Sequence, residues 1–356
     1  MKKYLLATTL ILAATGSVRA DVVVMSWGGD YGAAQVAAFN RPFTEQTGIK
    51  SSMVDSDNPT ALVKSMVEAK NVTVDVVEVE YPDAIRGCNE GLLERIDPAI
   101  LPASSDGAAA KDDFLEGSIT ECGVGTIIYS SVFAYDNQKF PQGPTTIADF
   151  FDTKKFPGKR ALRKQPKFAL EMALMADGVT AANVYKVLGT PEGVDRAFAK
   201  LNSVKDQLVW YGANAEAARL LADGEVVMSS GPANRFFNAA VAEGKPFTTV
   251  WDGQIYDFAM FVIPKGAPHL EDAKKYLAFA TDTKQLAKIA TELPFGPARK
   301  SSIPLVHFFK DGKTDIRPHM PTNPDNLKNA IPVSSEFWGD HEAELTERLS
   351  SWLASN

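Results

Sequence analysis

Strand-like and helix-like segments alternate along the first part of this chain. Apolar stretches that predict short strands lie at residues 21–26, 50–55 and 75–79. Amphipathic stretches that predict helices follow them at residues 32–47, 59–70 and 82–87. The first helix is expected to bend near Pro42 and to end at Gly48, and Asn58 is expected to cap the second. This alternation, with strands apolar on both faces, indicates an α/β fold with a largely parallel sheet.

A second alternating set of segments extends from residue 146 to residue 243. An unusually long β-rich stretch precedes it at residues 123–135, and another apolar stretch follows it at residues 256–264. We therefore expect two α/β lobes joined by two crossover strands, with a ligand cleft between them. The expected lobe 1 covers residues 21–131 and is completed by residues 256–305, lobe 2 covers residues 132–255, and a C-terminal extension with a terminal helix covers residues 306–356.

The N-terminal residues predict export. Lys2 and Lys3 form a basic start, residues 4–16 are an apolar run too short to span a bilayer, and small residues flank Arg19 before a cut after Ala20. The expected location is the periplasm, with no stable membrane insertion, because no later run is long and apolar enough for a transmembrane helix. Removing 20 of the 356 residues leaves 336, more than one compact core usually holds.

Charge and motifs narrow the class of function. The formal net charge is -7, and losing the three basic residues of the signal peptide makes it about -10. An acidic surface argues against nucleic acid as a partner. No metalloprotease helix motif, serine nucleophile elbow or glycine-rich phosphate loop occurs, so we expect no cofactor, no metal site and no catalytic activity.

The two cysteines, Cys88 and Cys122, predict a disulfide in an exported chain. Closing a loop of 34 residues would stabilise the fold by roughly 3–4 kcal/mol in the chain-entropy model. The alternative is an exported enzyme with a cysteine nucleophile, which requires a free thiol of low pKa and a nearby base. All four histidines lie in the last quarter of the chain.

Several motifs, in order and spacing, are similar to those of the periplasmic solute-binding proteins of ABC importers, in the spermidine/putrescine-binding-protein-like family. They are SWGG at residues 26–29, RPFTEQTGIK at 41–50, DVVEVEYPDAIRGCNEGLLERID at 75–97, ADGEVVMSSGPA at 222–233 and FVIPKGAPHLEDAKKYLAF at 261–279. The resemblance covers residues 21 to about 305. It implies the type II binding-protein fold, a small-molecule ligand in the cleft, and ABC transporter permease subunits as partners.

Open α/β sheets bind ligands at the carboxyl ends of their strands. Trp27 follows the first predicted strand, where its ring could cover a ligand amine or methylene chain. Asp30 could pair with an amine, although an N-cap is the expected role of an aspartate at that point. Glu80 and Tyr81 follow the third strand and are candidate cleft residues, with a solvated loop as the alternative.

Residues 229–232 (SSGP) predict a strand end, a tight turn at Gly231 and a helix opened by Pro232. The free N–H groups of such a helix start favour a carboxylate, with Ser230 beside them. Arg235, one turn into that helix, could hold the same carboxylate through two parallel hydrogen bonds. The alternative is a surface ion pair of Arg235 with Glu225 or Glu243.

Asp257 lies between Tyr256 and Phe258 at the start of the candidate return strand. A carboxylate between aromatic side chains is a good ammonium site, whereas an ordinary turn residue is the alternative. Trp210 ends another predicted strand. With Trp27, Tyr256 and Phe258, it is expected to cover the methylene groups of a ligand.

The stretch from Arg163 to Lys167 is basic, whereas polyamine binders of the family carry acidic residues there. A pocket with one acid and several cations would repel a polyamine and suit a zwitterion. We therefore predict a γ-aminobutyrate-like ligand, as in one branch of the family. Opine-type conjugates and the polyamines putrescine and spermidine remain alternatives, and it stays open whether residues 163–167 face the cleft.

Overall fold

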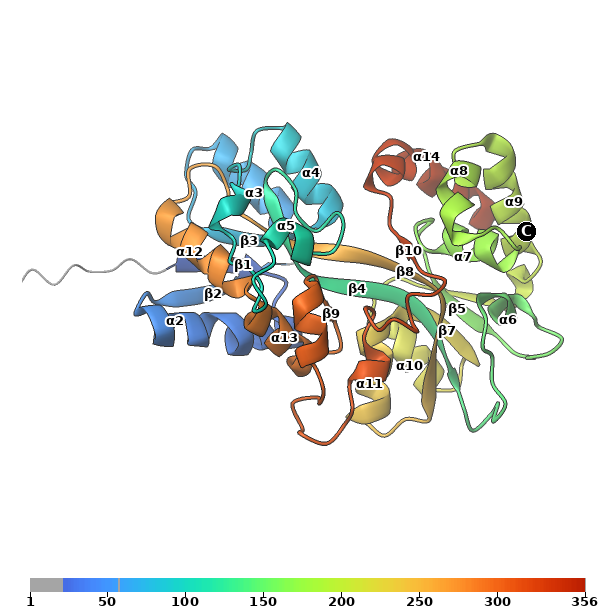
Figure 1. Ribbon diagram of the computed structural model, residues 1–356. Helices are drawn as coiled ribbons and strands as arrows, with labels where there is room; N and C mark the ends of the chain where they lie inside the picture. The colour runs from blue at the N-terminus through green and yellow to red at the C-terminus, as the bar shows by residue number, and fades with distance from the viewer. Residues whose placement is uncertain (1–21, 57, 356) are drawn as a thin grey trace, which may run out of the picture.

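The computed structural model describes residues 22–56 and 58–355 (Figure 1). The predicted signal peptide, residues 1–20, and its cleavage point lie outside these residues. Two lobes lie side by side in Figure 1, and the long strands β4 (Gly123–Asp136) and β8 (Phe247–Val262) run between them. Within the described residues, no helix combines the length and the apolar character needed to cross a membrane.

The first lobe contains the parallel strands β1 (Val22–Ser26), β2 (Ser51–Asp55) and β3 (Val76–Glu80), with β1 in the middle. Strand β8 pairs with β3 in the antiparallel direction. The helices of this lobe are α1 (Gly29–Gln35), α2 (Arg41–Thr47), α3 (Pro59–Glu68), α4 (Tyr81–Asn89), α5 (Ala110–Asp113), α12 (Leu270–Ala280) and α13 (Thr283–Glu292). Shorter elements are η1 (Val36–Asn40), η2 (Pro98–Ile100), β9 (Gly296–Pro297) and η5 (Lys300–Leu305).

Local sequence signals account for several helix ends in this lobe. The predicted helix over residues 32–47 is α1, the π-helical turn η1 and α2 in succession, with Pro42 in the first turn of α2. Gly48 ends it in the left-handed conformation, at φ 70°. Asn58 caps α3, as predicted, because its Oδ1 accepts a hydrogen bond from Ala61 N at 3.1 Å.

The second lobe has a similar plan. Its parallel strands are β5 (Arg160–Arg163), β6 (Leu208–Tyr211) and β7 (Met228–Pro232), and β7 pairs with β4 in the antiparallel direction. Its helices are α6 (Ile147–Phe151), α7 (Ala169–Ala176), α8 (Val184–Leu188), α9 (Pro191–Asn202), α10 (Glu216–Ala222), α11 (Ala233–Val241) and α14 (Ser335–Ala354). Short 3₁₀ turns are η3 (Ala181–Asn183), η4 (Lys205–Gln207) and η6 (Arg317–His319).

The crossover strands take part in the cores of both lobes. In β4, Val124 and Ile127 are buried in the first core, whereas Phe133 is buried in the second. In β8, Phe261 belongs to the first core and Ile255 to the second. Together with the parallel strands of each lobe, the crossover strands form one sheet in the order β2-β1-β3-β8-β4-β7-β5-β6. Paired β-strands, rather than a flexible tether, connect the lobes.

The segment after residue 305 packs against both lobes, since Val306 and Ile316 share a buried cluster with Ala287 of α13 and Phe237 of α11. Strand β10 (Ile331–Pro332) pairs with β8 in parallel, with Ile331 opposite Ile255. Trp338 and Leu345 of α14 are buried in the second core. The predicted terminal helix is α14, and Ser334 caps its start by accepting a hydrogen bond from Phe337 N at 3.2 Å.

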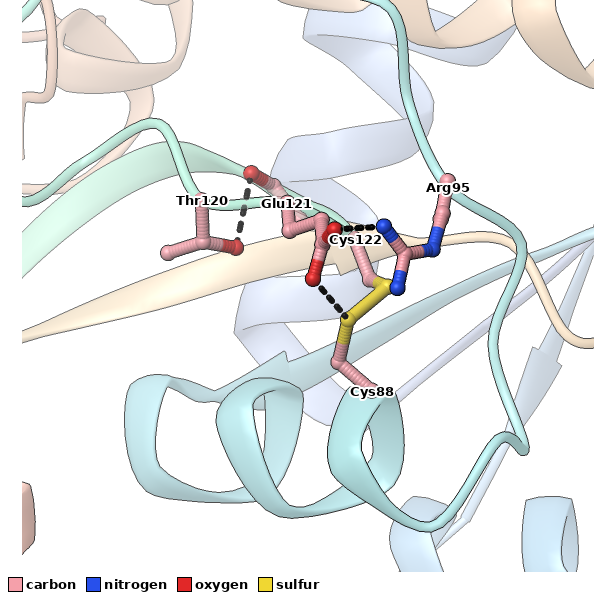
Figure 2. The surroundings of a disulfide bond; sticks show 6 residues. Cys88, Arg95, Thr120, Glu121 and Cys122 are labelled. Carbon is pink, nitrogen blue, oxygen red and sulfur yellow. Dashed lines mark hydrogen bonds and ion pairs between the residues drawn. A yellow bond between two sulfur atoms is a disulfide. The ribbon is translucent and has the colours of Figure 1, made fainter.

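The predicted disulfide is confirmed. Cys88 near the end of α4 is bonded to Cys122 just before β4, with Cα atoms 5.7 Å apart (Figure 2). The bond ties α4 to the start of a crossover strand, and Arg95 and Glu121 form an ion pair beside it. The chain has two cysteines and both are in this bond. No thiol is therefore free to act as a nucleophile, and the enzyme alternative is wrong.

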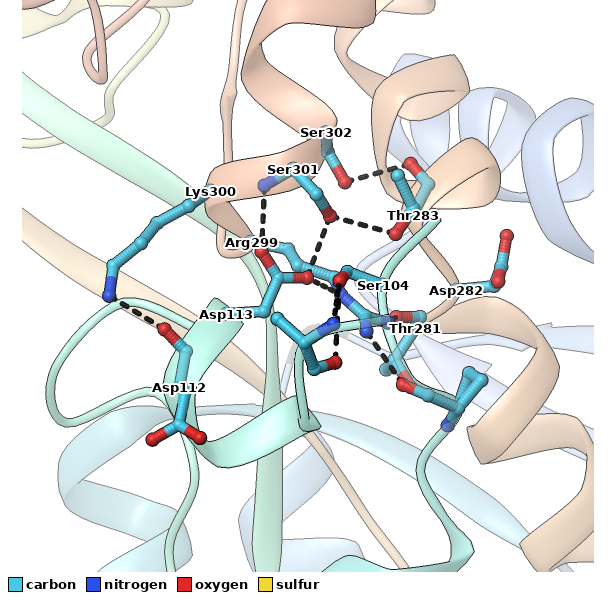
Figure 3. A network of polar contacts seen from close by, with 12 residues as sticks. Ser104, Asp112, Asp113, Thr281, Asp282, Thr283, Arg299, Lys300, Ser301 and Ser302 are labelled. Carbon is cyan, nitrogen blue, oxygen red and sulfur yellow. Dashed lines mark hydrogen bonds and ion pairs between the residues drawn. The ribbon is translucent and has the colours of Figure 1, made fainter. Parts of the chain in front are cut away.

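A buried ion pair in the first lobe links α5, the end of α12 and the start of η5 (Figure 3). The Arg299 guanidinium is paired with Asp113 and donates to Thr281 O at 3.0 Å. Ser301 donates to Asp113 twice, from its backbone N at 2.9 Å and from its hydroxyl at 2.6 Å. Burial would raise the pKa of Asp113, but the Ser301 hydrogen bonds and the Arg299 charge outweigh burial and lower it.

Candidate functional site

A cleft of about 680 Å³ lies between the two lobes. It opens where parallel strands end: Trp27 follows β1, Glu80 ends β3 and Arg163 ends β5. The lining side chains from the first lobe and the crossovers include Trp27, Tyr31, Glu80, Ile127, Tyr129, Ala259 and Phe295. Those from the second lobe include Arg163, Gln165, Lys167, Phe168, Asn214, Ser230, Asn234, Arg235 and Glu342.

The aromatic part of the first wall is fixed from beneath. The Trp27 and Tyr31 rings lie 6.2 Å apart, and Tyr31 meets Phe295 edge-on at 5.2 Å. The Tyr31 hydroxyl donates to Glu78 Oε1 at 2.8 Å. Burial raises the pKa of the Glu78 carboxyl, although hydrogen bonds from Thr126, Tyr31 and others oppose this. Tyr31 is therefore held against the cleft by a buried carboxyl group.

Glu80 lines the acidic part of the first wall, whereas the predicted site residue Asp257 is buried behind it and is not among the lining residues. Strand pairing places Tyr129 directly opposite Asp257, and the Tyr129 hydroxyl lies 3.4 Å from Asp257 Oδ2. Burial raises the pKa of Asp257 to about 7, the nearby Glu80 carboxylate adds to the rise, and a hydrogen bond from Phe258 N opposes it. Burial also raises the pKa of Glu80. Both carboxyls are poorly hydrated, and a cation between them would favour their ionised forms.

The basic stretch that the sequence left open faces the cleft. Arg163, Gln165 and Lys167 line it, whereas Lys164 is exposed and does not. Gln165 Nε2 is buried and has no hydrogen-bond partner among the described residues. The second wall therefore offers two cations and an unused amide donor.

Ser230 and Arg235 also line the cleft, at the end of β7 and in the first turn of α11. Gly231 lies within β7 and is extended, so the predicted tight turn there is wrong. A Cβ at this position would lie 2.6 Å from the Ala217 Cβ, so close packing requires a glycine. The exposed Arg235 makes no hydrogen bond or ion pair with another described residue. The alternative pairing with Glu225 or Glu243 is therefore absent from the described part of the chain.

Two predicted residues on helix starts lie outside the cleft. Asp30 is exposed in the first turn of α1, and the N-cap position belongs to Gly28, so the expected cap at Asp30 is wrong. Tyr81 begins α4 and packs against Phe258, with ring centroids 6.1 Å apart. Neither is among the lining residues, because the helix that follows each strand turns these side chains away from the strand ends.

The alternation of side chains along a strand explains why three further predicted site residues do not line the cleft. Trp210 packs on Trp352 of α14 at 6.0 Å, whereas the next residue of β6, Tyr211, lines the cleft. Tyr256 and Phe258 flank Asp257 in β8 and therefore point to the opposite face of the sheet. Their rings contact one another at 6.2 Å. These three aromatic side chains do not line the cleft that Trp27 lines.

Comparison with known proteins matches residues 37–317 to the family described as bacterial extracellular solute-binding proteins. The chain belongs to this family. It is 42% identical over 342 residues to the gamma-aminobutyric acid-binding protein of Pseudomonas aeruginosa, covering 96% of this chain and 93% of that protein. Proteins of the family bind solutes and are not enzymes.

Solved structures of similar proteins have the same overall fold as this chain. A GABA receptor structure has a TM-score of 0.79 and 32% identity, covering 95% of this chain and 98% of that one. A periplasmic binding protein from A. tumefaciens, in complex with agropinic acid, has a TM-score of 0.72 and 30% identity, covering 94% and 99%. The predicted family resemblance and the type II binding-protein fold are confirmed.

Sequence reasoning missed several lining residues of this solute-binding protein. Tyr31 in α1 and Lys167 in the loop after β5 line the cleft, but neither was singled out as a candidate. Tyr129 could have been found from the cross-strand register with Asp257. Glu342 comes from α14, in the segment expected to be an extension, and no local signal marked it. The described residues contain no group of His, Cys, Asp or Glu that could hold a metal ion.

Proposed function

We propose that this solute-binding protein captures a small ω-amino acid of the γ-aminobutyrate type between its lobes. The observation that carries the proposal is the distribution of charge in the cleft. Glu80 lines one wall with Asp257 behind it, and Arg235 lines the other beside the start of α11. A ligand with an ammonium at one end and a carboxylate at the other complements both walls at once.

Each end of the ligand has a physical counterpart. Glu80 and Asp257 would hold the ammonium, because both carboxyls are poorly hydrated and gain from a nearby cation. Arg235 and the free N–H groups of α11 would hold the carboxylate, with the Ser230 hydroxyl in reach of the same wall. Trp27 and Tyr31 would cover the methylene groups.

The relatives support this assignment. A protein 42% identical to this chain is named for binding gamma-aminobutyric acid, and a similar solved structure is described as a GABA receptor. We further infer that the chain is cleaved after Ala20, works in the periplasm and delivers its ligand to the permease subunits of an ABC importer. The basic start and apolar run before Ala20 support export.

The test is calorimetric titration of the protein that begins at Asp21 with γ-aminobutyrate, putrescine and spermidine. We expect binding of γ-aminobutyrate, and roughly 10- to 100-fold weaker binding by Arg235→Ala, because a hydrogen bond to a charged group contributes about 1.5–3 kcal/mol. Arg219→Ala is the matched control, since Arg219 is an exposed arginine of the same lobe that does not line the cleft.

Normal binding by Arg235→Ala would rule out the carboxylate assignment. Binding of polyamines without γ-aminobutyrate would overturn the zwitterion proposal in favour of the polyamine alternative.

A further inference from the structure

The loop between β5 and α7 carries Lys167 and is anchored at both ends. Lys164 N donates to Tyr211 O at 2.8 Å, and Leu170 N donates to Pro166 O at 3.0 Å. Phe168 has φ 73°, a left-handed conformation that residues other than glycine rarely adopt, and its ring packs against the second core. The backbone that presents Lys167 to the cleft is therefore held in one conformation.

Lys167 of the second lobe lines the cleft opposite Glu80 of the first lobe, with the buried Asp257 behind Glu80. Its positive charge opposes the rise that burial causes in the pKa of Glu80 and in the pKa of Asp257. Its ammonium makes no ion pair with another described residue, and it lies 5.9 Å from the centre of the Phe168 ring. Lys167 thus sits close enough to influence Glu80 and Asp257 without binding either one directly.

We propose that Lys167 sets how many positive charges the cleft accepts, and so excludes diamines and polyamines. Glu80 and Asp257 bring two negative charges when ionised; Lys167 acts on both, whereas Arg163 of the same cleft acts on Glu80. These cations already offset much of the negative charge, which leaves the two carboxyls able to accept one ligand ammonium. A second ammonium would leave excess positive charge in a partly dehydrated cleft, where like charges repel strongly. This inference rests on the proposed function, in which the first wall holds an ammonium.

The experiment compares γ-aminobutyrate and putrescine by calorimetry in four proteins: the unmodified chain, Lys167→Met, Lys167→Arg and Lys164→Met. Methionine keeps the length and apolar stem of Lys167 but removes its charge. Lys164 lies in the same loop, is exposed and does not line the cleft, so Lys164→Met is the matched control. We expect Lys167→Met to gain putrescine affinity by about tenfold or more, because juxtaposed like charges cost several kcal/mol.

Lys167→Arg and Lys164→Met should reject putrescine as the unmodified chain does. The inference is overturned if folded Lys167→Met, or Lys167→Gln as a second neutral variant, still prefers γ-aminobutyrate to the same degree. In that case the proposed function stands, because the unmodified chain binds γ-aminobutyrate. If the unmodified chain binds neither compound but Lys167→Met binds putrescine, the proposed function fails and the role of Lys167 holds. Putrescine binding by the unmodified chain overturns the role of Lys167, and it overturns the proposed function as well when γ-aminobutyrate does not bind. No binding by any protein overturns both.

Discussion

The first lobe faces the cleft with aromatic and acidic side chains, whereas the second lobe faces it mainly with cations. Trp27, Tyr31 and Glu80 belong to the first wall, and Arg163, Lys167 and Arg235 belong to the second. Neither wall alone complements a zwitterion. In the proposed function each lobe holds one end of such a ligand, so the ligand would stabilise the arrangement in which both lobes contact it.

The interiors of the two lobes also differ in how they hold a buried arginine. In the first lobe, Arg299 is paired with the carboxylate of Asp113. In the second lobe, Arg160 is fully buried and donates to main-chain carbonyls, among them Phe150 O at 2.9 Å and Asp152 O at 3.0 Å. Burial lowers the pKa of Arg160 to about 10. A buried cation can therefore be held by a paired counter-ion or mainly by peptide carbonyls, to which the nearby Asp152 charge adds in the case of Arg160.

Replacing these arginines should give the largest loss of stability. It should also distinguish an arginine held by an ion pair from one held by main-chain carbonyls. Arg299→Met leaves the Asp113 carboxylate buried without its counter-ion, and we expect a loss of about 3–5 kcal/mol in the free energy of unfolding. Arg160→Met leaves only neutral carbonyls unpaired, and we expect a loss of about 1–3 kcal/mol. Urea unfolding measures both. Equal losses would contradict the distinction, and hydrogen exchange should place the Arg299→Met loss in the first lobe.

The acidic wall should make ligand binding depend on pH. The pKa of Asp257 is raised to about 7 without ligand, and a bound ammonium would lower it by favouring the carboxylate. Affinity for γ-aminobutyrate should therefore fall as pH drops below 7, by up to roughly tenfold per pH unit for one coupled proton. Calorimetry in buffers of different ionisation enthalpy measures the proton release.

Asp257→Asn should bind more weakly and lose this dependence on pH. Asp30→Asn is the control, since Asp30 is exposed and does not line the cleft, and it should titrate like the unmodified chain. An unchanged pH profile in Asp257→Asn would mean that the acidic wall does not hold the ammonium through Asp257.

The smallest effect should come from two tyrosines, one in each lobe, that donate a hydrogen bond to a buried glutamate. Tyr31 donates to the buried Glu78 at 2.8 Å, and Tyr185 donates to the buried Glu171 at 3.1 Å. Replacing either tyrosine with phenylalanine should lower the free energy of unfolding by about 1–2 kcal/mol, because a buried carboxyl loses a donor. Of the two, Tyr31 lines the cleft. Thermal unfolding with and without ligand should show weaker binding in Tyr31→Phe and unchanged binding in Tyr185→Phe.

Local patterns predicted much of the fold. The apolar runs that became β1, β3 and β4 and the cap at Asn58 depend on short stretches of sequence, and the structure confirms them. The start of β8 at Phe247 was missed, because residues before Tyr256 alternate too weakly to predict a strand; they are ordered by pairing with β4. Pairing between distant segments therefore extended what local pattern could only begin.

The sequence by itself determined the alternating α/β plan, the disulfide between the two cysteines and the loops that surround the cleft, because periodicity, cysteine count and strand ends are local properties. Only the tertiary structure decided which side chain of each loop enters the cleft. Trp210 points away while its neighbour Tyr211 faces the ligand site, since adjacent strand residues lie on opposite faces. Glu342 reaches the same site from α14, and no local rule predicts a contact between segments so distant in sequence.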